Sequence, residues 1–236
     1  MVLEKQDGKL LQQYEQKPSD KLTFYDGHDF IKNNIVDIWE KAIPYNVVNK
    51  IYKKILLNNN KIEFSSFTLG EDLEFNSKVL EVCDKIVTLP EWFYKYVRDR
   101  ESAATAKYIN NWFQIRSDEH IRIMDFFKNL YFPCPVPQEA SEFASRRFVN
   151  RSIGCIENEF RIKNSFGERY KNISGIVKSS DLQNAIKIGK NYSIKIKMIL
   201  LPIRCKSVLL TYMVGFSISL VRSTFPRLFE FLKYRR

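Results

Sequence analysis

The sequence is poor in the residues that build metal centres and disulfide frameworks. Its 236 residues include only four cysteines and two histidines, His28 and His120. The cysteines lie far apart in the sequence and none forms a Cys-x-x-Cys pair, which excludes the usual structural zinc motifs. Widely spaced thiols, in a chain that opens without the apolar run of a signal peptide, are typical of reduced, mostly buried cysteines, so we expect a protein of the cytosol.

Long apolar runs are missing as well. The uncharged run from Ser207 to Val221 spans fifteen residues, whereas a helix needs about twenty to cross a bilayer core. The composition still provides a core, because 44% of the residues are hydrophobic and 14% are aromatic. These values exclude a disordered chain, and the length allows one domain or two small ones.

Acidic residues are almost absent from the end of the chain. The formal net charge is +11, and after Lys187 the only acidic residue is Glu230. The basic residues there alternate with bulky aliphatic residues rather than with aromatic stacking platforms, so we expect an anionic membrane surface as partner and no nucleic acid. The sequence predicts a basic amphipathic helical tail, residues 181–236, peripheral on the inner face of the cell membrane. The alternative is a helical hairpin packed on the domain.

The central stretch of the chain, residues 44–102, contains two acidic residues directly after a glycine. Gly70-Glu71-Asp72 precedes an amphipathic run in which Leu73 and Asn76 share one helical face. This order places Glu71 and Asp72 at the N-terminus of a helix, where the helix dipole and free backbone N–H groups favour ionised carboxylates. Asp72 is therefore a candidate general base, and the alternative is a carboxylate that only stabilises the helix end.

Four segments of this stretch occur in an order that resembles a known family. They are Asn-Lys-x-Tyr-Lys at 49–53, Gly-Glu-Asp-Leu-x-Phe-Asn at 70–76, a hydrophobic strand ending in Leu-Pro-Glu at 91, and Tyr-x-Tyr-x-Arg-x-x-x-Ser at 94–102. Over roughly residues 20–125 the chain resembles the second half of the catalytic domain of family 2 glycosyltransferases, which have the GT-A fold. The resemblance implies an α/β fold, a partial GT-A-like (Rossmann-like) mixed sheet, followed by a largely helical C-terminal region.

The resemblance also implies a site. Asp72 would accept a proton from an acceptor hydroxyl, with Glu71 orienting the loop or hydrogen-bonding the acceptor. The remaining substrate-binding positions that it implies are one lysine, two arginines, one serine and one tryptophan: Lys50, Arg98, Arg100, Ser102 and Trp39. The partners would be a nucleotide-sugar donor and a surface-glycan or lipid-linked acceptor. Each position also has a structural alternative. Lys50 would be a solvated surface lysine, the loop at 98–102 a surface loop with an internal Arg/Asp pair, and Trp39 a core residue of a packing helix.

The family's donor site has no counterpart in this chain. Members normally open with an apolar strand and a nucleotide-binding loop, and an Asp-x-Asp motif then holds a divalent metal, Mg or Mn, against the diphosphate. We find no Asp-x-Asp in the sequence, so a metal is expected for the complete family enzyme but no ligating motif is present here. Two hypotheses follow: a glycosyltransferase or a truncated part of one, inactive in isolation, and a non-catalytic membrane-associated relic or partner protein.

Periodicity and turn residues predict the other elements. A hairpin is expected around Asp7-Gly8, helices over 29–39, 50–57, 118–130 and 139–161, and strands over 85–89 and 92–97. Ser19 or Asp20 is expected to cap the first helix, and Ser180 a later one. We expect an acceptor-side domain over 1–132, a helical connector region over 133–180 and the tail over 181–236. His120, among charged neighbours, is expected at the surface.

Overall fold

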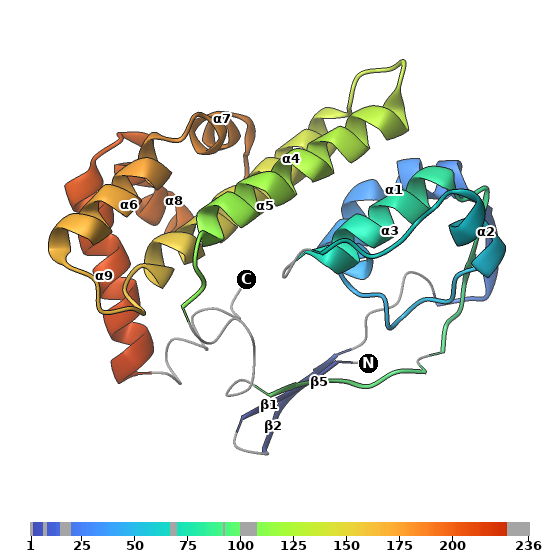
Figure 1. The fold of residues 1–236 in the computed structure, drawn as a ribbon, viewed down its shortest axis with the longest axis horizontal. Coiled ribbons are helices and arrows are strands. Elements are labelled where there is room, and N and C mark those ends of the chain that lie inside the picture. The colour runs from blue at the N-terminus through green and yellow to red at the C-terminus, as the bar shows by residue number, and fades with distance from the viewer. Residues whose placement is uncertain are drawn as a thin grey trace. The chain divides into compact units, whose positions relative to one another are not determined.

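The structure is a computed structural model that describes residues 2–6, 9–14, 20–66, 70–91, 93–99 and 108–225, with the backbone alone for most residues of the N-terminal hairpin. Helices predominate, and the strands form two small sheets (Figure 1). In chain order the elements are β1 (Val2–Gln6), β2 (Lys9–Tyr14), β3 (Thr23–Asp26), α1 (Gly27–Glu40), the 3-10 turn η1 (Ile43–Tyr45), α2 (Lys54–Asn59), α3 (Glu71–Val82), β4 (Lys85–Thr88), β5 (Tyr96–Asp99), α4 (Trp112–Tyr131), α5 (Gln138–Asn158), α6 (Phe166–Lys178), α7 (Ser180–Ile188), α8 (Ile194–Arg204) and α9 (Val208–Thr224).

The chain forms two compact units that do not follow the expected three-part division. Unit 1 comprises Met1–Ala106 and Arg122–Ala140, and unit 2 comprises Lys107–Ile121 and Ser141–Arg236. Helices α4 and α5 therefore each contribute to both units. The proline-rich connector at 132–137 lies within unit 1 and does not mark the boundary, because the divisions fall inside α4, after Ile121, and inside α5, after Ala140.

Unit 1 contains both sheets. The predicted N-terminal hairpin is confirmed, since β1 pairs antiparallel with β2, and β5 adds in parallel on the other side of β1 to give a mixed three-stranded sheet. In the second sheet, β3 pairs antiparallel with β4, and Phe24 lies directly opposite Val87. The 85–89 strand is thus confirmed, and the later strand is shorter than predicted and begins at Tyr96.

Helix α1 packs against both strands of the β3–β4 sheet, where the ring of Tyr25 contacts Phe30. Helix α1 is capped by Asp26, whose side chain accepts a hydrogen bond from the backbone N–H of Asp29, so the prediction of Asp20 as the cap is wrong, and Ser19 lies outside the described residues. A glycine is required at position 27, because a Cβ there would lie 2.0 Å from the carbonyl oxygen of Cys83. This close approach joins the start of α1 to the end of α3.

The described residues of unit 2 form helices and their connections, and its core includes the last three helices. Its buried cluster combines Phe148 and Val149 of α5 with Leu182 of α7, Leu200 of α8 and Val208 of α9. Ser179, not Ser180, caps α7, and a full capping box occurs instead at the start of α6. The inner faces of α8 and α9 are therefore packed on the domain, as the hairpin alternative expected.

The chain is mixed α and β at the coarse level that the sequence predicted, with far more helix than strand. The uncharged run at 207–221 begins at the N-cap of α9, Ser207, and the rest of it lies within this helix, as expected. Among the residues that the structure describes, no helix combines the length and the apolar character that a membrane span requires.

Candidate functional site

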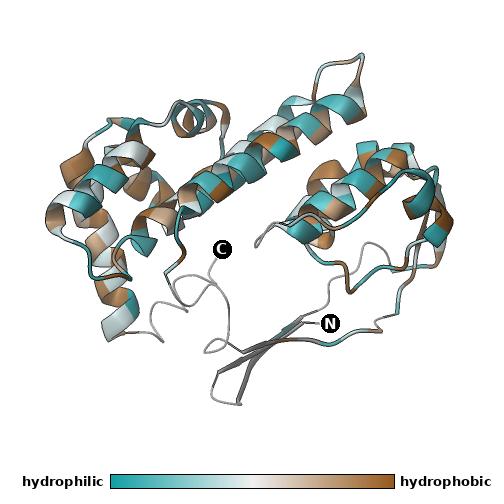
Figure 2. Cartoon of the chain, viewed as in Figure 1, coloured by the Kyte–Doolittle hydropathy of each residue, from teal (hydrophilic) through white to brown (hydrophobic). Residues whose placement is uncertain are grey.

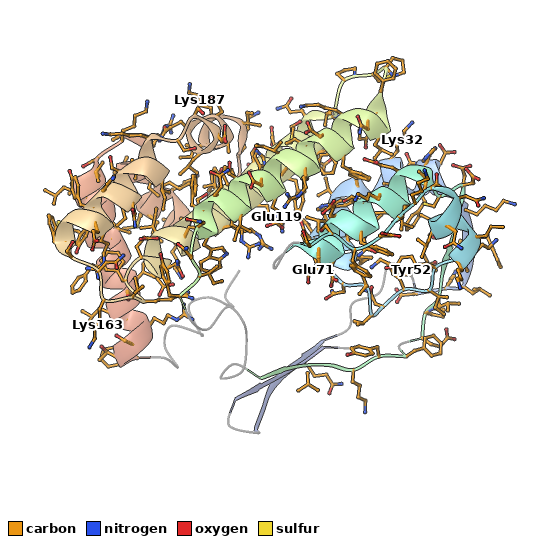
Figure 3. All side chains as sticks on the ribbon, in the orientation of Figure 1. Lys32, Tyr52, Glu71, Glu119, Lys163 and Lys187 are labelled. Carbon is orange, nitrogen blue, oxygen red and sulfur yellow. The ribbon has the colours of Figure 1, made fainter. Side chains whose placement is uncertain are left out.

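The candidate site is built around the first turn of α3. Gly70 precedes the helix with a φ of 93°, in the left-handed region that favours glycine. Glu71 and Asp72 both lie in the first turn, as the sequence predicted, where the positive end of the helix dipole stabilises carboxylates. Figure 3 marks Glu71 at this end of α3 and Tyr52 in the preceding segment.

The carboxylate of Asp72 is covered by the loop that follows η1. The backbone N–H of Val47 donates a hydrogen bond to it, and the Lys50 ammonium acts on it electrostatically. Burial nevertheless raises the pKa of Asp72 above its usual value, and the neighbouring charge of Glu71 raises it further. A half-buried carboxylate with a raised pKa is a stronger proton acceptor than an exposed one.

Lys50 anchors this loop from inside. Its Nζ donates hydrogen bonds to the carbonyl oxygens of Ile43 and Asn46, at 2.5 and 2.6 Å, and to Oδ1 of Asn49 at 2.7 Å. Burial lowers the pKa of Lys50 to about 7, against the opposing effect of the Asp72 charge. Because an ammonium has three N–H bonds and all three are engaged, direct contact between Lys50 and a substrate would require one of these hydrogen bonds to break.

Asn76 fastens the same loop to the side of α3. This side chain is 1% exposed, and its Nδ2 donates to the carbonyl oxygens of Pro44 at 2.8 Å and Asn46 at 3.3 Å. Its Oδ1 accepts a hydrogen bond from the Tyr52 hydroxyl at 2.6 Å. Burial raises the pKa of Tyr52, so the phenol stays protonated and keeps donating at neutral pH.

Aromatic rings of α3 and of the preceding segment pack together. The rings of Phe64 and Phe75 stack with their centroids 4.3 Å apart, and Tyr52 meets Phe75 edge-on at 5.2 Å. Phe64 remains 54% exposed. A stacked and half-exposed phenylalanine ring is the kind of surface on which a sugar ring or an isoprenoid chain can pack.

The other sequence-predicted residues are placed differently. Trp39 lies in the core of unit 1, where it packs against Phe126 and Phe127, as its packing-helix alternative expected. Of Arg98 the structure describes only the backbone, in β5, and Arg100 and Ser102 lie outside the described residues. The roles of these three residues stay predictions, and the burial of Trp39, which is 2% exposed, favours its packing role.

Sequence reasoning missed the role of Asn76, although the signal was present. Asn76 shares its helical face with Leu73, and an amide on the buried face of an amphipathic helix must find hydrogen-bond partners inside the protein. The partners themselves come from the loop at 44–52, some thirty residues earlier, and no periodicity reveals them.

Among the described residues, the site coincides neither with a surface hollow nor with a group of metal-binding side chains. A surface hollow of about 390 Å³ is lined by parts of α1 and by Tyr131 and Glu139, but by none of the predicted site residues. Within the described ranges, no three His, Cys, Asp or Glu side chains are grouped so that they could hold a metal ion. These residues do not by themselves fit the Mg or Mn ion expected for the complete family enzyme.

Unit 2 contains a separate buried ion-pair network. Glu119 accepts hydrogen bonds from Arg116 at 2.6 Å and Arg147 at 2.5 Å, and despite its burial the arginines hold the pKa of Glu119 at about 2. The ring of His120 stacks on Phe148 at 4.6 Å, so the prediction of a surface histidine is wrong. Burial lowers the pKa of His120 to about 4, and a neutral ring suits a structural role.

Comparisons with models of protein families, with curated proteins and with solved structures found no match to this chain.

Proposed function

We propose that this chain is the acceptor-side half of a GT-A-like glycosyltransferase, or a part of such an enzyme. It would assist transfer of a sugar from a nucleotide-sugar donor to a surface-glycan or lipid-linked acceptor. The observation that supports this most strongly is the Asp72 carboxylate, held at a glycine-initiated helix N-terminus under a hydrogen-bonded loop. The resemblance of its motifs to family 2 glycosyltransferases supplies the reaction class.

The proposed chemistry needs one proton acceptor from this half. The acceptor hydroxyl attacks the anomeric carbon of the donor, its proton passes to Asp72, and the bond between the anomeric carbon and the diphosphate oxygen breaks. The nucleoside diphosphate leaves with the electron pair of that bond. Asp72 serves well because the hydroxyl becomes strongly acidic only as the glycosidic bond forms. Glu71 orients the acceptor, and Arg98 and Arg100 would neutralise the departing diphosphate.

An uncovered face of the β3–β4 sheet supports the proposal that another half is needed. Phe24 is 75% exposed and Val87 opposite it is 49% exposed, whereas Tyr25, which points to the other face, contacts Phe30 of α1. A two-stranded sheet is rarely stable alone, and an apolar outer face is where further layers add. In a complete enzyme the donor-binding half would cover this face.

The second candidate function is a non-catalytic relic or partner protein. The absence of Asp-x-Asp from the sequence favours it, because a chain that cannot hold a donor diphosphate cannot turn over alone. The two candidates share the acceptor-side fold and differ in turnover. For either, we propose a peripheral location on the inner face of the cell membrane, in view of the positive charge of the chain after Lys187.

Ligand binding to the whole chain tests the proposal. We expect an acceptor-type oligosaccharide or isoprenyl phosphate to shift the amide NMR signals of Gly70–Asp72 and of the 44–52 loop, with weaker effects in Asp72→Asn. We expect no manganese-dependent binding of a nucleoside diphosphate by calorimetry at micromolar concentration. Acceptor signals that shift only elsewhere, or micromolar nucleotide binding, would contradict the proposal.

A further inference from the structure

The outer face of α9 is apolar along its length. Leu209, Leu210, Met213, Phe216 and Leu220 recur on one side of this helix, and each is more than half exposed. The opposite side is fixed to unit 2: Thr211 is 1% exposed, and a Cβ at Gly215 would lie 2.8 Å from both Ile156 and Phe160. Because the inner side is so closely packed, the apolar outer face cannot turn inward.

Helix α8 carries a second exposed apolar stripe. Ile194, Met198 and Leu201 follow helical spacing and are 78, 71 and 64% exposed. Lys197 and Arg204 flank the stripe on one side and Lys195 on the other, and all three are exposed. Figure 2 shows apolar residues on both helices.

The charge around these stripes has one sign. Between Asp181 and Glu230 the sequence contains no acidic residue, whereas Lys195, Lys197, Arg204 and Lys206 belong to α8 and to the link that joins it to α9. A contact between two copies of this surface would bring like charges together, which disfavours a homodimer. A bilayer with anionic lipids offers both partners that the surface needs, negative headgroups and acyl chains.

We propose that the outer faces of α8 and α9 form a lipid-binding surface that inserts into one leaflet of an anionic membrane while both helices stay folded on unit 2. This deepens the location given above, and it rests on none of the residues assigned to the transfer reaction. The membrane-binding surface is thus one face of the folded unit 2 and not a separate helix that leaves the unit to bind lipid. Its binding combines an apolar contribution that salt does not screen with an electrostatic one that salt weakens.

Flotation of the full-length chain with vesicles tests the apolar contribution. The probe is a vesicle of phosphatidylcholine with about a third phosphatidylglycerol, compared with phosphatidylcholine alone. We expect Leu210→Gln with Met213→Gln to lower the partition coefficient about tenfold or more. The matched control is Ile51→Gln with Ile55→Gln, which removes exposed apolar side chains from unit 1 and should leave binding unchanged.

A second pair of variants tests the charge. Lys197→Gln with Arg204→Gln should lower binding to the anionic vesicles about tenfold at low salt and much less at high salt. Lys53→Gln with Lys54→Gln makes the same change of charge on exposed residues of unit 1 and should have little effect. Circular dichroism confirms that each variant keeps its helices.

Three results would overturn the proposal. The first is a wild-type chain that does not float with anionic vesicles at low salt. The second is an equal loss of binding in the control variants. The third is a wild-type dimer, measured by light scattering, that the α9 variant converts to a monomer without any change in flotation; this face would then be a protein interface. Acceptor binding at Asp72 is independent of all three, so the two proposals fail separately.

Discussion

The candidate site is held in place by the buried side chains of Asn76 and Lys50, which bind the loop at 44–52, rather than by its carboxylates. Asn76 makes three hydrogen bonds that join α3 to the 44–52 loop, and that loop covers Asp72. The position of Asp72 relative to the loop therefore depends on the hydrogen bonds of Asn76. Removing such a side chain leaves its buried partners without hydrogen bonds, which costs more than the bonds themselves contribute.

We predict that Asn76→Ala lowers the free energy of unfolding of unit 1 by about 2–4 kcal/mol and that the pKa of Asp72 falls toward its usual value as the loop opens. Urea unfolding measures the first, and carboxyl NMR titration the second. The control is Asn60→Ala, because Asn60 makes an exposed hydrogen bond to Leu56 and should cost less than about 0.5 kcal/mol. Equal effects of the two variants would contradict this account.

His120 gives a prediction for pH. Its folded-state pKa is about 4, below the ordinary value of 6.5, so between these pH values the unfolded chain binds more protons than the folded one. The stability of unit 2 should therefore fall as the pH drops from 6.5 to 4, by about 2–3 kcal/mol. Glu119, with its pKa held near 2, adds a loss that begins below about pH 4.5.

The measurement is urea unfolding at several pH values. In His120→Phe, which keeps a ring against Phe148, the slope between pH 6.5 and 4 should disappear while the loss at lower pH remains. If His120→Phe keeps the wild-type dependence of stability on pH between 6.5 and 4, the pKa of His120 is the same in the folded and unfolded chains and the prediction is wrong.

The positions of helices and strands along the sequence were largely predictable, but which elements pair or pack with one another was not. The helix after Gly70 and the strand at Lys85 follow from local spacing and turn residues. The predicted cap of α1 was wrong because the true cap, Asp26, is also the last residue of strand β3. An acidic residue at the end of a strand gives no separate sign that a helix begins there. The pairing of β1 with β5 and the packing of α9 on α5 and α6 depend on contacts between distant segments, which local periodicity does not encode.

Two helix glycines provide a test of how closely α9 packs. We predict that Gly215→Ala destabilises unit 2 by about 1–3 kcal/mol, since the new methyl group would overlap Ile156 and Phe160. Gly175→Ala, within α6, has open space around it and should stabilise by about 0.5–1 kcal/mol through helix propensity. Thermal unfolding of both variants checks this, and a stabilising Gly215→Ala would show that α9 is less closely packed.

The whole chain has two compact units, and the end of the chain belongs to the second. Leu182, Leu200, Ile203 and Val208 come from α7–α9 and complete the core that α5 and α6 begin. A chain that ends near Ser180 should therefore lose the fold of unit 2 rather than shed a tail. We expect such a chain to show reduced helicity and a tendency to aggregate; a monomeric product with native helicity in α5 and α6, measured by NMR, would contradict this.

Turnover shows whether the first turn of α3 supplies the proton acceptor of a sugar transfer. The chain is joined to a family 2 donor-binding half, and transfer to the acceptor is measured beside donor binding. We expect the wild-type fusion to transfer sugar, Asp72→Asn to lower the rate by at least a hundredfold, and donor affinity to stay within about twofold. Unchanged turnover in an active Asp72→Asn fusion would contradict the claim and leave Asp72 as a helix-end carboxylate.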